Sequence, residues 1–394
     1  MKHTEQSKKL FTLYEELDVT GEELPEETIE DTMSQDEARY AASQWKLMWR
    51  KFLCNKAAII GGIVILLMYF IALFANFFVP YTLTTRFRNR IYFPPQRVHF
   101  FHEGQFLGPF VYGSKLTIDK KTFAKNYSVD MTKVHPIKFF AKGEPYKLFG
   151  RLDAETHFFL SEGGPVNLFG TDRQGRDMFT RILLGSQISL TIGLIGVFLS
   201  LFLGTILGIT SGYYGGQVDN LIQRLIELVR SFPAIPLWMA LSAALPSHWP
   251  PLRTYFAVTL ILSLIGWTWL ARQLRGKVLT LRNEEFILAA KLAGSSDCRI
   301  IFKHLIPSTL GHIIVVSTLA MPAMILAETS LSFLGLGLRA PLTSWGVLLQ
   351  EAQNIQSIAI YPWVFMPALF IAITILAFNF LGDGLRDAAD PYSR

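Results

Sequence analysis

The stretch from Ala57 to Val79, AAIIGGIVILLMYFIALFANFFV, is 23 residues long and carries no charge. A helix of this length rises about 35 Å at 1.5 Å per residue, enough to cross a hydrocarbon core of roughly 30 Å. Pro80 ends the run. A basic and aromatic flank precedes it: Trp45, Lys46, Trp49, Arg50, Lys51 and Lys56. The sequence therefore predicts a first transmembrane helix over 56–80.

The composition of the whole chain agrees with a lipid-facing protein. Of 394 residues, 51% are hydrophobic and 17% are charged, and the mean hydropathy is +0.31. Soluble domains carry about 25% charged residues. This deficit of charge excludes a disordered or nucleic-acid-wrapping chain and argues against an ordinary soluble enzyme. Cys54 and Cys298 are the two cysteines, so a disulfide scaffold is excluded as well.

Five further apolar segments follow the first. They run roughly over Ile188–Ile209, Phe232–Leu245, Tyr255–Leu270, Gly311–Leu334 and Pro362–Leu381. Prolines interrupt several of them, which bundled membrane helices tolerate. The fold expected is an all-α polytopic membrane protein with six transmembrane helices.

The orientation follows from the short loops. The stretch 271–304 is rich in Lys and Arg, whereas the short loops on the other side carry almost none. Basic short loops stay cytoplasmic, so we expect both termini in the cytoplasm. The expected organisation is a cytoplasmic arm over 1–55, the first span, an extracytoplasmic insert over 81–180, a transmembrane helix bundle over 181–384 and a cytoplasmic tail over 385–394.

The insert between the first two spans differs from the rest in composition. It is polar, with frequent Gly and Pro, and patches such as Phe106–Tyr112 and 147–149 indicate strands. We expect a β or α/β structure. Its aromatic residues either dock a partner protein or form its own small core: Phe100, Phe101, Phe106, Phe110 and Tyr112.

The chain shows no catalytic constellation and no Cys/His spacing typical of a metal site, so we expect neither catalysis nor a cofactor. The stretch Gly108–Lys115 has the wrong residue order for a phosphate loop. Glycines recur every four residues at Gly204, Gly208, Gly212 and Gly216, a pattern that permits close helix packing. Polar residues in or near the spans are candidates for function or for helix-end structure: Arg224, Glu227 and Glu328.

Residues 285–307, called the coupling segment below, are too polar to span a membrane and too apolar for a plain loop. A first short helix is expected to place Phe286, Ala289, Ala290 and Ala293 on one face. Gly294 should break it. A second short helix is expected from about Ser296 to His304, capped by Ser295 or Ser296. Such a pair forms either a docking knob for another protein or an ordinary connecting loop.

The coupling segment resembles the coupling motif of ABC importer permeases. That pattern is Glu-Ala-Ala, three residues, Gly, nine residues, then Ile-x-Leu-Pro. Four positions match it: Ala289, Ala290, Gly294 and Pro307. Three positions depart from it: Leu288 replaces the Glu, His304 the Ile and Ile306 the Leu.

The resemblance extends over about 168–394 and the first helix, to the C-type subunit of dipeptide and oligopeptide permeases. It rests on several motifs: Gly170-Thr171-Asp172, Gly175-Arg176-Asp177, Arg181, Gly212-Tyr213, Gly215-Gly216, Asp219, Arg224, Glu227, Phe232-Pro233, Glu328, 331–337, Ser344-Trp345-Gly346, 382–387 and Asp390-Pro391.

The resemblance implies a type I ABC importer permease in the bacterial inner membrane. Its expected partners are a second permease, two cytoplasmic ATPases, an external binding protein and a peptide substrate. The residues expected to couple to the ATPases are Phe286, Ala289, Ala290, Lys291, Gly294, Asp297, Arg299, Lys303, His304 and Pro307. The alternatives are the same architecture importing nickel or a peptide antibiotic, and a membrane receptor or intramembrane enzyme.

Overall fold

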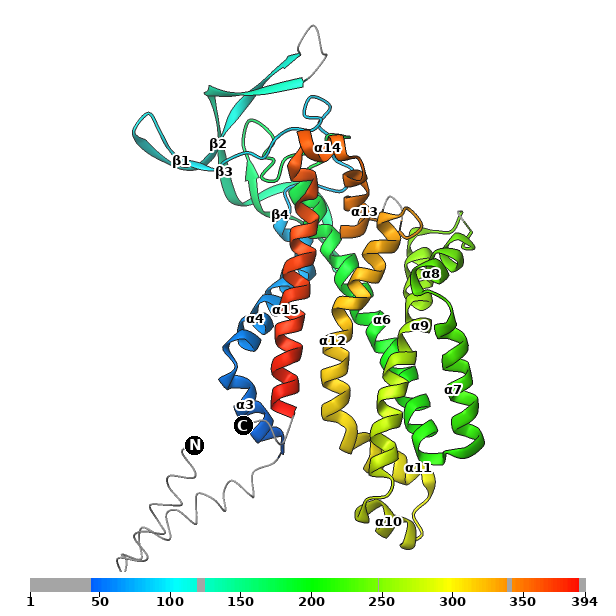
Figure 1. Ribbon diagram of the computed structural model, residues 1–394. Helices are drawn as coiled ribbons and strands as arrows, with labels where there is room; N and C mark the ends of the chain where they lie inside the picture. The colour runs from blue at the N-terminus through cyan, green and yellow to red at the C-terminus, as the bar shows by residue number, and fades with distance from the viewer. Residues whose placement is uncertain (1–43, 119–124, 247, 339–341, 390–394) are drawn as a thin grey trace, which may run out of the picture. The chain divides into compact units, whose positions relative to one another are not determined.

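The computed structural model describes residues 44–118, 125–246, 248–338 and 342–389 (Figure 1). The chain divides into two units, 1–54 and 55–394. In the first unit, α3 (Gln44–Cys54) carries the basic and aromatic residues, and Trp49 stacks on Phe52 with ring centroids 5.6 Å apart. All the elements described next belong to the second unit.

The first predicted span is confirmed as α4 (Lys56–Leu73), followed by the short α5 (Ala75–Phe78). Asn55 begins α4, because its side-chain oxygen accepts a 3.2 Å hydrogen bond from the Ala58 N–H. Gly61 allows α4 to pack closely on α15 (Met366–Ala389), since a Cβ there would lie 2.6 Å from a carbonyl oxygen of that helix. Six large apolar side chains of α4 are exposed, as lipid-facing residues are: Ile60, Ile63, Leu66, Leu67, Phe70 and Leu73.

Two long helices, α6 (Met178–Tyr214) and α9 (Pro251–Leu281), pack along each other over most of their length (Figure 1). The glycine stripe makes this possible. A Cβ on Gly208 would lie 2.6 Å from the Ala271 carbonyl oxygen, and one on Gly212 would lie 2.9 Å from that of Arg275. The predicted close approach is therefore confirmed for the helix interior. Gly216 lies beyond the end of α6, with nothing near it.

The third predicted span is a bent pair of helices. α7 (Gly216–Ser231) and α8 (Ala234–Ala243) meet at Phe232-Pro233 with a bend of 82°. Pro233 lacks an N–H and disfavours a helical conformation at Phe232, whose backbone is extended here, so the helix breaks at this point. Five helices of the described chain are long and apolar enough to cross a membrane, and the bent pair makes six if it counts as one span.

The remaining helices complete the bundle. α12 (Ile306–Phe333) and α15 pack together and against α4 and α6, and α15 follows a 3₁₀ turn, η3 (Pro362–Phe365). Between α12 and α15 lie three short elements: α13 (Trp345–Leu349), η2 (Gln350–Gln353) and α14 (Ile355–Ile360). Trp345 is fully buried, and its indole N–H donates to the Ile182 carbonyl, which ties α13 to α6.

The insert contains a four-stranded antiparallel sheet in the order β1-β2-β3-β4, so the predicted β structure is confirmed. The strands are β1 (His99–His102), β2 (Gln105–Ile118), β3 (Lys125–Leu148) and β4 (Leu152–Ser161). The rejected phosphate-loop stretch is part of β2. The sheet lies at the end of the bundle near α13 and α14, and the coupling segment lies at the opposite end (Figure 1).

Candidate coupling site

The first half of the coupling segment folds as predicted. α10 (Glu285–Leu292) ends at Gly294, whose φ is +73°. The Gly294 N–H donates to the Lys291 carbonyl and the Ser295 N–H to the Ala290 carbonyl, both at 3.0 Å. This pair of bonds is a Schellman motif, which needs a left-handed residue that glycine adopts without steric cost. Gly294 therefore sets the direction of the chain after α10.

The second half differs from the prediction. α11 (Asp297–Ile300) does not end as a separate helix at His304 but continues through a π-helical turn, η1 (Ile301–Leu305), into α12. Pro307 accounts for the wide turn, because it has no N–H for the carbonyl four residues earlier. The Ile306 N–H instead reaches back five residues to Ile301. Ser296 stands at the predicted N-cap position without a side-chain cap bond.

Apolar contacts fix the coupling segment to two spans. Ile287 of α10, Ile300 of α11 and Leu305 of η1 are fully buried. They form one cluster with residues of α6 and α9, among them Tyr213 and Val278. Burying a side chain of this size is worth about 1.5–3 kcal/mol, so the segment is held firmly against the bundle rather than hanging from it.

Polar contacts add to this attachment. The Tyr213 hydroxyl donates to the Asp297 carboxylate over 2.7 Å. The Lys291 ammonium lies 5.0 Å from the centroid of the Tyr213 ring, within the range of a cation–π contact. The structure thus brings two predicted ATPase-contact residues to α6 of the same chain.

The outward surface of the coupling segment carries large apolar side chains among charged ones. The predicted helix face is confirmed as outward-facing at Phe286, Ala289 and Ala293, while Ala290 is partly buried. Sequence reasoning missed its two most prominent members: Leu292 is 90% exposed and Phe302 67% exposed. Large apolar residues in an otherwise polar loop were the available signal. The rim contains Arg299, Lys303 and Pro307, all exposed, and His304, which is half-buried.

The polar candidates near the spans do not join the coupling segment. The Arg224 guanidinium lies 3.0 Å from the Glu227 carboxylate on the exposed side of α7. Asp219, on the same helix, receives two 2.6 Å hydrogen bonds from Arg275 of α9. These contacts fix the start of α7 against the bundle and leave Arg224 and Glu227 paired with each other.

Glu328 is fully buried and connects three parts of the bundle. Its carboxylate accepts hydrogen bonds from Ser332 at 2.7 Å, Ser344 at 2.6 Å and Ser189 at 3.4 Å. These serines lie on α12, before α13 and on α6. The hydrogen bonds from these hydroxyls offset the free-energy cost of burying the carboxylate, and they fix the packing of the three elements.

A charged cluster closes the far end of α6. Asp172 accepts hydrogen bonds from both Arg176 and Arg181, and Glu351 of η2 lies 3.4 Å from each of those guanidinium groups. Sequence reasoning did not find Glu351, because it lies 170 residues after Arg181 along the chain. Asp177 caps α6 by accepting two 2.8 Å bonds from Thr180. Complete burial raises the pKa of Asp177 to about 6.

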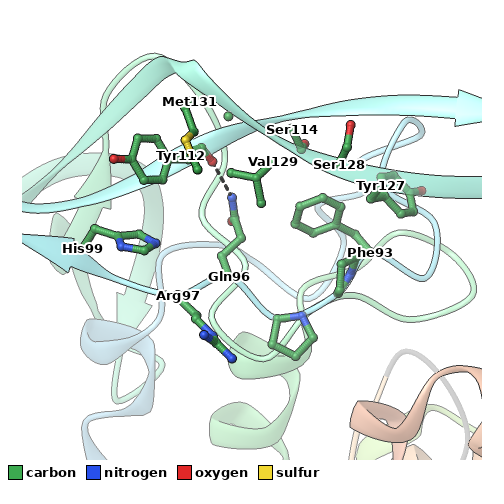
Figure 2. Close-up of a pocket in the computed structure, with 13 residues that line it drawn as sticks. Phe93, Gln96, Arg97, His99, Tyr112, Ser114, Tyr127, Ser128, Val129 and Met131 are labelled. Atoms are coloured by element: carbon green, nitrogen blue, oxygen red, sulfur yellow. Dashed lines mark hydrogen bonds between the residues drawn. The ribbon is translucent and has the colours of Figure 1, made fainter. Parts of the chain in front are cut away.

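The sheet and residues 93–97, which precede β1, together form a cavity of about 350 Å³ (Figure 2). Phe93 and Tyr127 meet edge to face at one end, and His99 and Tyr112 lie at the other. Gln96 lies between them and donates a 3.2 Å hydrogen bond to the Tyr112 carbonyl. The cavity lining combines these aromatic rings with two prolines, Val129 and Met131 and with polar side chains such as Arg97.

Two known families match parts of this chain that the helices and the coupling segment occupy. Residues 204–394, which contain the coupling segment, match the family described as binding-protein-dependent transport system inner membrane component. Residues 43–95, which contain α3 and α4, match the N-terminal transmembrane domain of oligopeptide transport permease C. The sheet lies between these two matched ranges.

Curated relatives agree with the family match. The oligopeptide transport system permease protein OppC of Bacillus subtilis is 37% identical over 251 residues, covering 63% of this chain and 80% of the relative. OppC of Haemophilus influenzae is 42% identical, covering 58% and 71%. The dipeptide permease DppC of Bacillus subtilis is 43% identical, covering 57% and 69%.

Among solved structures, an inward-facing MetNI methionine ABC transporter is 16% identical, with a TM-score of 0.41, covering 54% of this chain and 97% of that one. The family match rests on the sequence relatives. With its apolar helices, its coupling segment and these relatives on one chain, the protein is a multi-pass membrane protein that belongs to the OppC/DppC-type permeases of ABC transport systems.

Proposed function

We propose that this chain forms one half of the translocation path of an ABC importer for di- and oligopeptides. The observation that carries the proposal is the 37–43% identity to permeases named for oligopeptides and dipeptides, over 57–63% of this chain. A glutathione permease, GsiD of Escherichia coli, is 42% identical over 243 residues, which supports small peptides as the substrate class.

The contacts of the coupling segment support a mechanical role in transport. The outward apolar surface around Leu292 and Phe302 docks on a cytoplasmic ATPase, and the inward surface is fixed to α6 and α9. Because α11 continues into α12, a displacement of the segment is passed directly to a membrane span. ATPase closure then switches the bundle between inward-open and outward-open states.

The proposed assembly contains a second permease, two ATPases and an external binding protein. The coupling segment and both termini lie in the cytoplasm, and the insert over 81–180 lies outside. The position of the sheet and the coupling segment at opposite ends of the bundle supports this orientation (Figure 1). Arg224 and Glu227, on the exposed side of α7, are then candidates for contact with the second permease.

A topology experiment tests the orientation. Cys54 and Cys298 are exposed free thiols, so both are first replaced by serine. Val129→Cys on β3, at an exposed position, should react with a membrane-impermeant maleimide in intact cells whose outer membrane has been permeabilised. Arg299→Cys in the coupling segment should react only after lysis. The reverse labelling pattern would overturn the proposed orientation.

A transport experiment tests the substrate. The permease is reconstituted with its cognate subunits in proteoliposomes, and uptake of radiolabelled trialanine is compared with uptake of radioactive nickel. ATP-dependent, saturable peptide uptake is expected, with no accumulation of nickel. Nickel uptake without peptide uptake would refute the peptide assignment while leaving the permease architecture intact.

A further inference from the structure

A cluster of phenylalanines joins the end of the first span to the sheet. Its members come from α4 and α5, from β3 and the turn after it, and from β4: Phe70, Phe74, Phe77, Phe78, Phe139, Phe140, Phe149 and Phe158. The Phe74 and Phe149 ring centroids are 5.6 Å apart, and those of Phe77 and Phe140 are 6.0 Å apart. These contacts hold the β3–β4 hairpin against the helix end.

Several of the apolar side chains that the β3–β4 hairpin contributes at this cluster are exposed. Phe140 is 66% and Phe149 51% exposed, and Leu152 at the start of β4 is equally open. Phe140 and Phe149 also have positive φ angles, +53° and +54°. This left-handed conformation is unfavourable for a bulky side chain. The backbone is therefore strained at two positions that carry exposed apolar rings.

The depth of the hairpin tip follows from its contact with α4. Lys56 marks the start of α4, and Phe74 lies 18 residues further along the chain, which is about 27 Å along a helix axis. The hydrocarbon core is roughly 30 Å thick, so Phe74 lies just inside its far edge. Phe149, which packs on Phe74, is placed at the same level.

The neighbouring residues continue the same surface. Leu66, Phe70 and Leu73 are exposed on α4, a helix that crosses the membrane. Lys147 and Arg151 flank the hairpin tip and are exposed. Long basic side chains at such a position can extend toward lipid phosphates while their stems stay in apolar surroundings. The exposed rings are thus continuous with a lipid-facing surface and bordered by cations.

We propose that the tip of the β3–β4 hairpin, with Phe149 and Leu152, inserts into the lipid bilayer beside the end of α4. The occupant of this apolar surface is the acyl-chain edge of the leaflet nearest the sheet. The hairpin then fixes the sheet at a set height and tilt above the membrane. This inference requires only that α4 crosses the membrane, and it is independent of the substrate.

Spin labels on the full chain test the proposal. In the variant without Cys54 and Cys298, Phe149→Cys and Leu152→Cys are labelled with a nitroxide and reconstituted into phosphatidylethanolamine–phosphatidylglycerol vesicles. Met131→Cys, at a 67% exposed position on the distal half of β3, is the matched control. Power saturation then compares collisions with oxygen, which concentrates in lipid, and with a water-soluble nickel chelate.

Lipid insertion predicts that labels at 149 and 152 favour oxygen, whereas the label at 131 favours the nickel chelate. Labels at 149 and 152 that behave like the control would overturn the proposal. Shielding from both reagents would overturn it too, since a protein partner would then cover the surface. Should the variants fail to fold, a diazirine-bearing phospholipid is photolysed with the unmodified chain. Adducts are expected within 147–153, and their absence there would refute lipid insertion.

Discussion

The left-handed turn at Gly294 allows a sharp test of coupling. A Cβ at this position would meet nothing within 4 Å, so a substitution has room in the folded chain. The only cost is conformational, because φ is +73°. For a β-branched residue this cost is about 1–2 kcal/mol, whereas asparagine tolerates the conformation best among non-glycine residues. Gly294→Val and Gly294→Asn thus form a matched pair.

The expected consequence is loss of coupling without loss of the fold. A penalty of about 1–2 kcal/mol raises the ratio of unformed to formed turn about 5–30-fold. Ile287 and Ile300 lie on either side of the turn and keep both halves attached to the bundle, so the substitution loosens only the connection between the halves. The bundle does not depend on this turn, and membrane abundance should stay normal.

The assay measures peptide uptake and peptide-stimulated ATP hydrolysis in proteoliposomes that contain the complete complex. Gly294→Val should lose most uptake, and Gly294→Asn should keep most of it. Gly294→Trp should be inactive, because it adds a large ring beside the docking surface. Equal uptake by the valine and asparagine variants would refute the reasoning, and so would a valine variant that fails to reach the membrane.

Three other predictions concern the bundle and the insert. Burial raises the pKa of Asp177 from 3.8 to about 6, so folding favours the protonated carboxyl. The free energy of unfolding should therefore rise by on the order of 3 kcal/mol as the pH falls from above 6 to below 4. Thermal melts of Asp177→Asn should not show this rise. Glu328→Leu should lower the melting temperature markedly, because it leaves buried serine hydroxyls without their acceptor, at about 1–3 kcal/mol each. Glu328→Gln keeps an acceptor oxygen and should restore part of the loss. Equal melting temperatures for both variants would contradict the carboxylate's role. Phe110→Ala should lower the free energy of unfolding by about 3–5 kcal/mol and reduce the abundance of the permease, because Phe110 is buried. Phe106→Ala should leave abundance unchanged and weaken co-purification of the binding protein, because Phe106 is exposed. Unchanged co-purification would exclude docking at Phe106.

The structure separates the insert aromatics into buried and exposed ones, and docking by the exposed ones stays a prediction. Phe110 is fully buried and belongs to the insert's own core, while Phe100, Phe101 and Phe106 are exposed on the β1–β2 hairpin. Composition alone cannot separate these cases, because strand register decides which side chains face inward. Here a bulge shifts the register between β1 and β2, which no local pattern in the sequence reveals.

The spans were largely predictable because hydropathy is a local property summed over about 20 residues. The break at Gly294 was predictable because it depends on one residue type. The pairing of Arg181 with Glu351 was not, since it joins α6 to η2 across 170 positions. The bend between α7 and α8 was only partly visible: Phe232-Pro233 marks the break, but its angle depends on packing.

The continuous path from α11 to α12 changes how the coupling segment transmits force. Two separate short helices would move as a loose knob, with a flexible joint before the span. The π turn at 301–305 carries α11 into α12 without an intervening loop, although Pro307 has no N–H to donate to the carbonyl four residues earlier. α10, by contrast, is joined to α11 through the Gly294 turn and to α6 through Ile287 and Tyr213. Under the proposed coupling role, an ATPase that pulls on Leu292 acts on α6, while one that pulls on Phe302 acts on α12. The turn at Gly294 joins these two paths, so we propose that it sets the relative motion of the two spans.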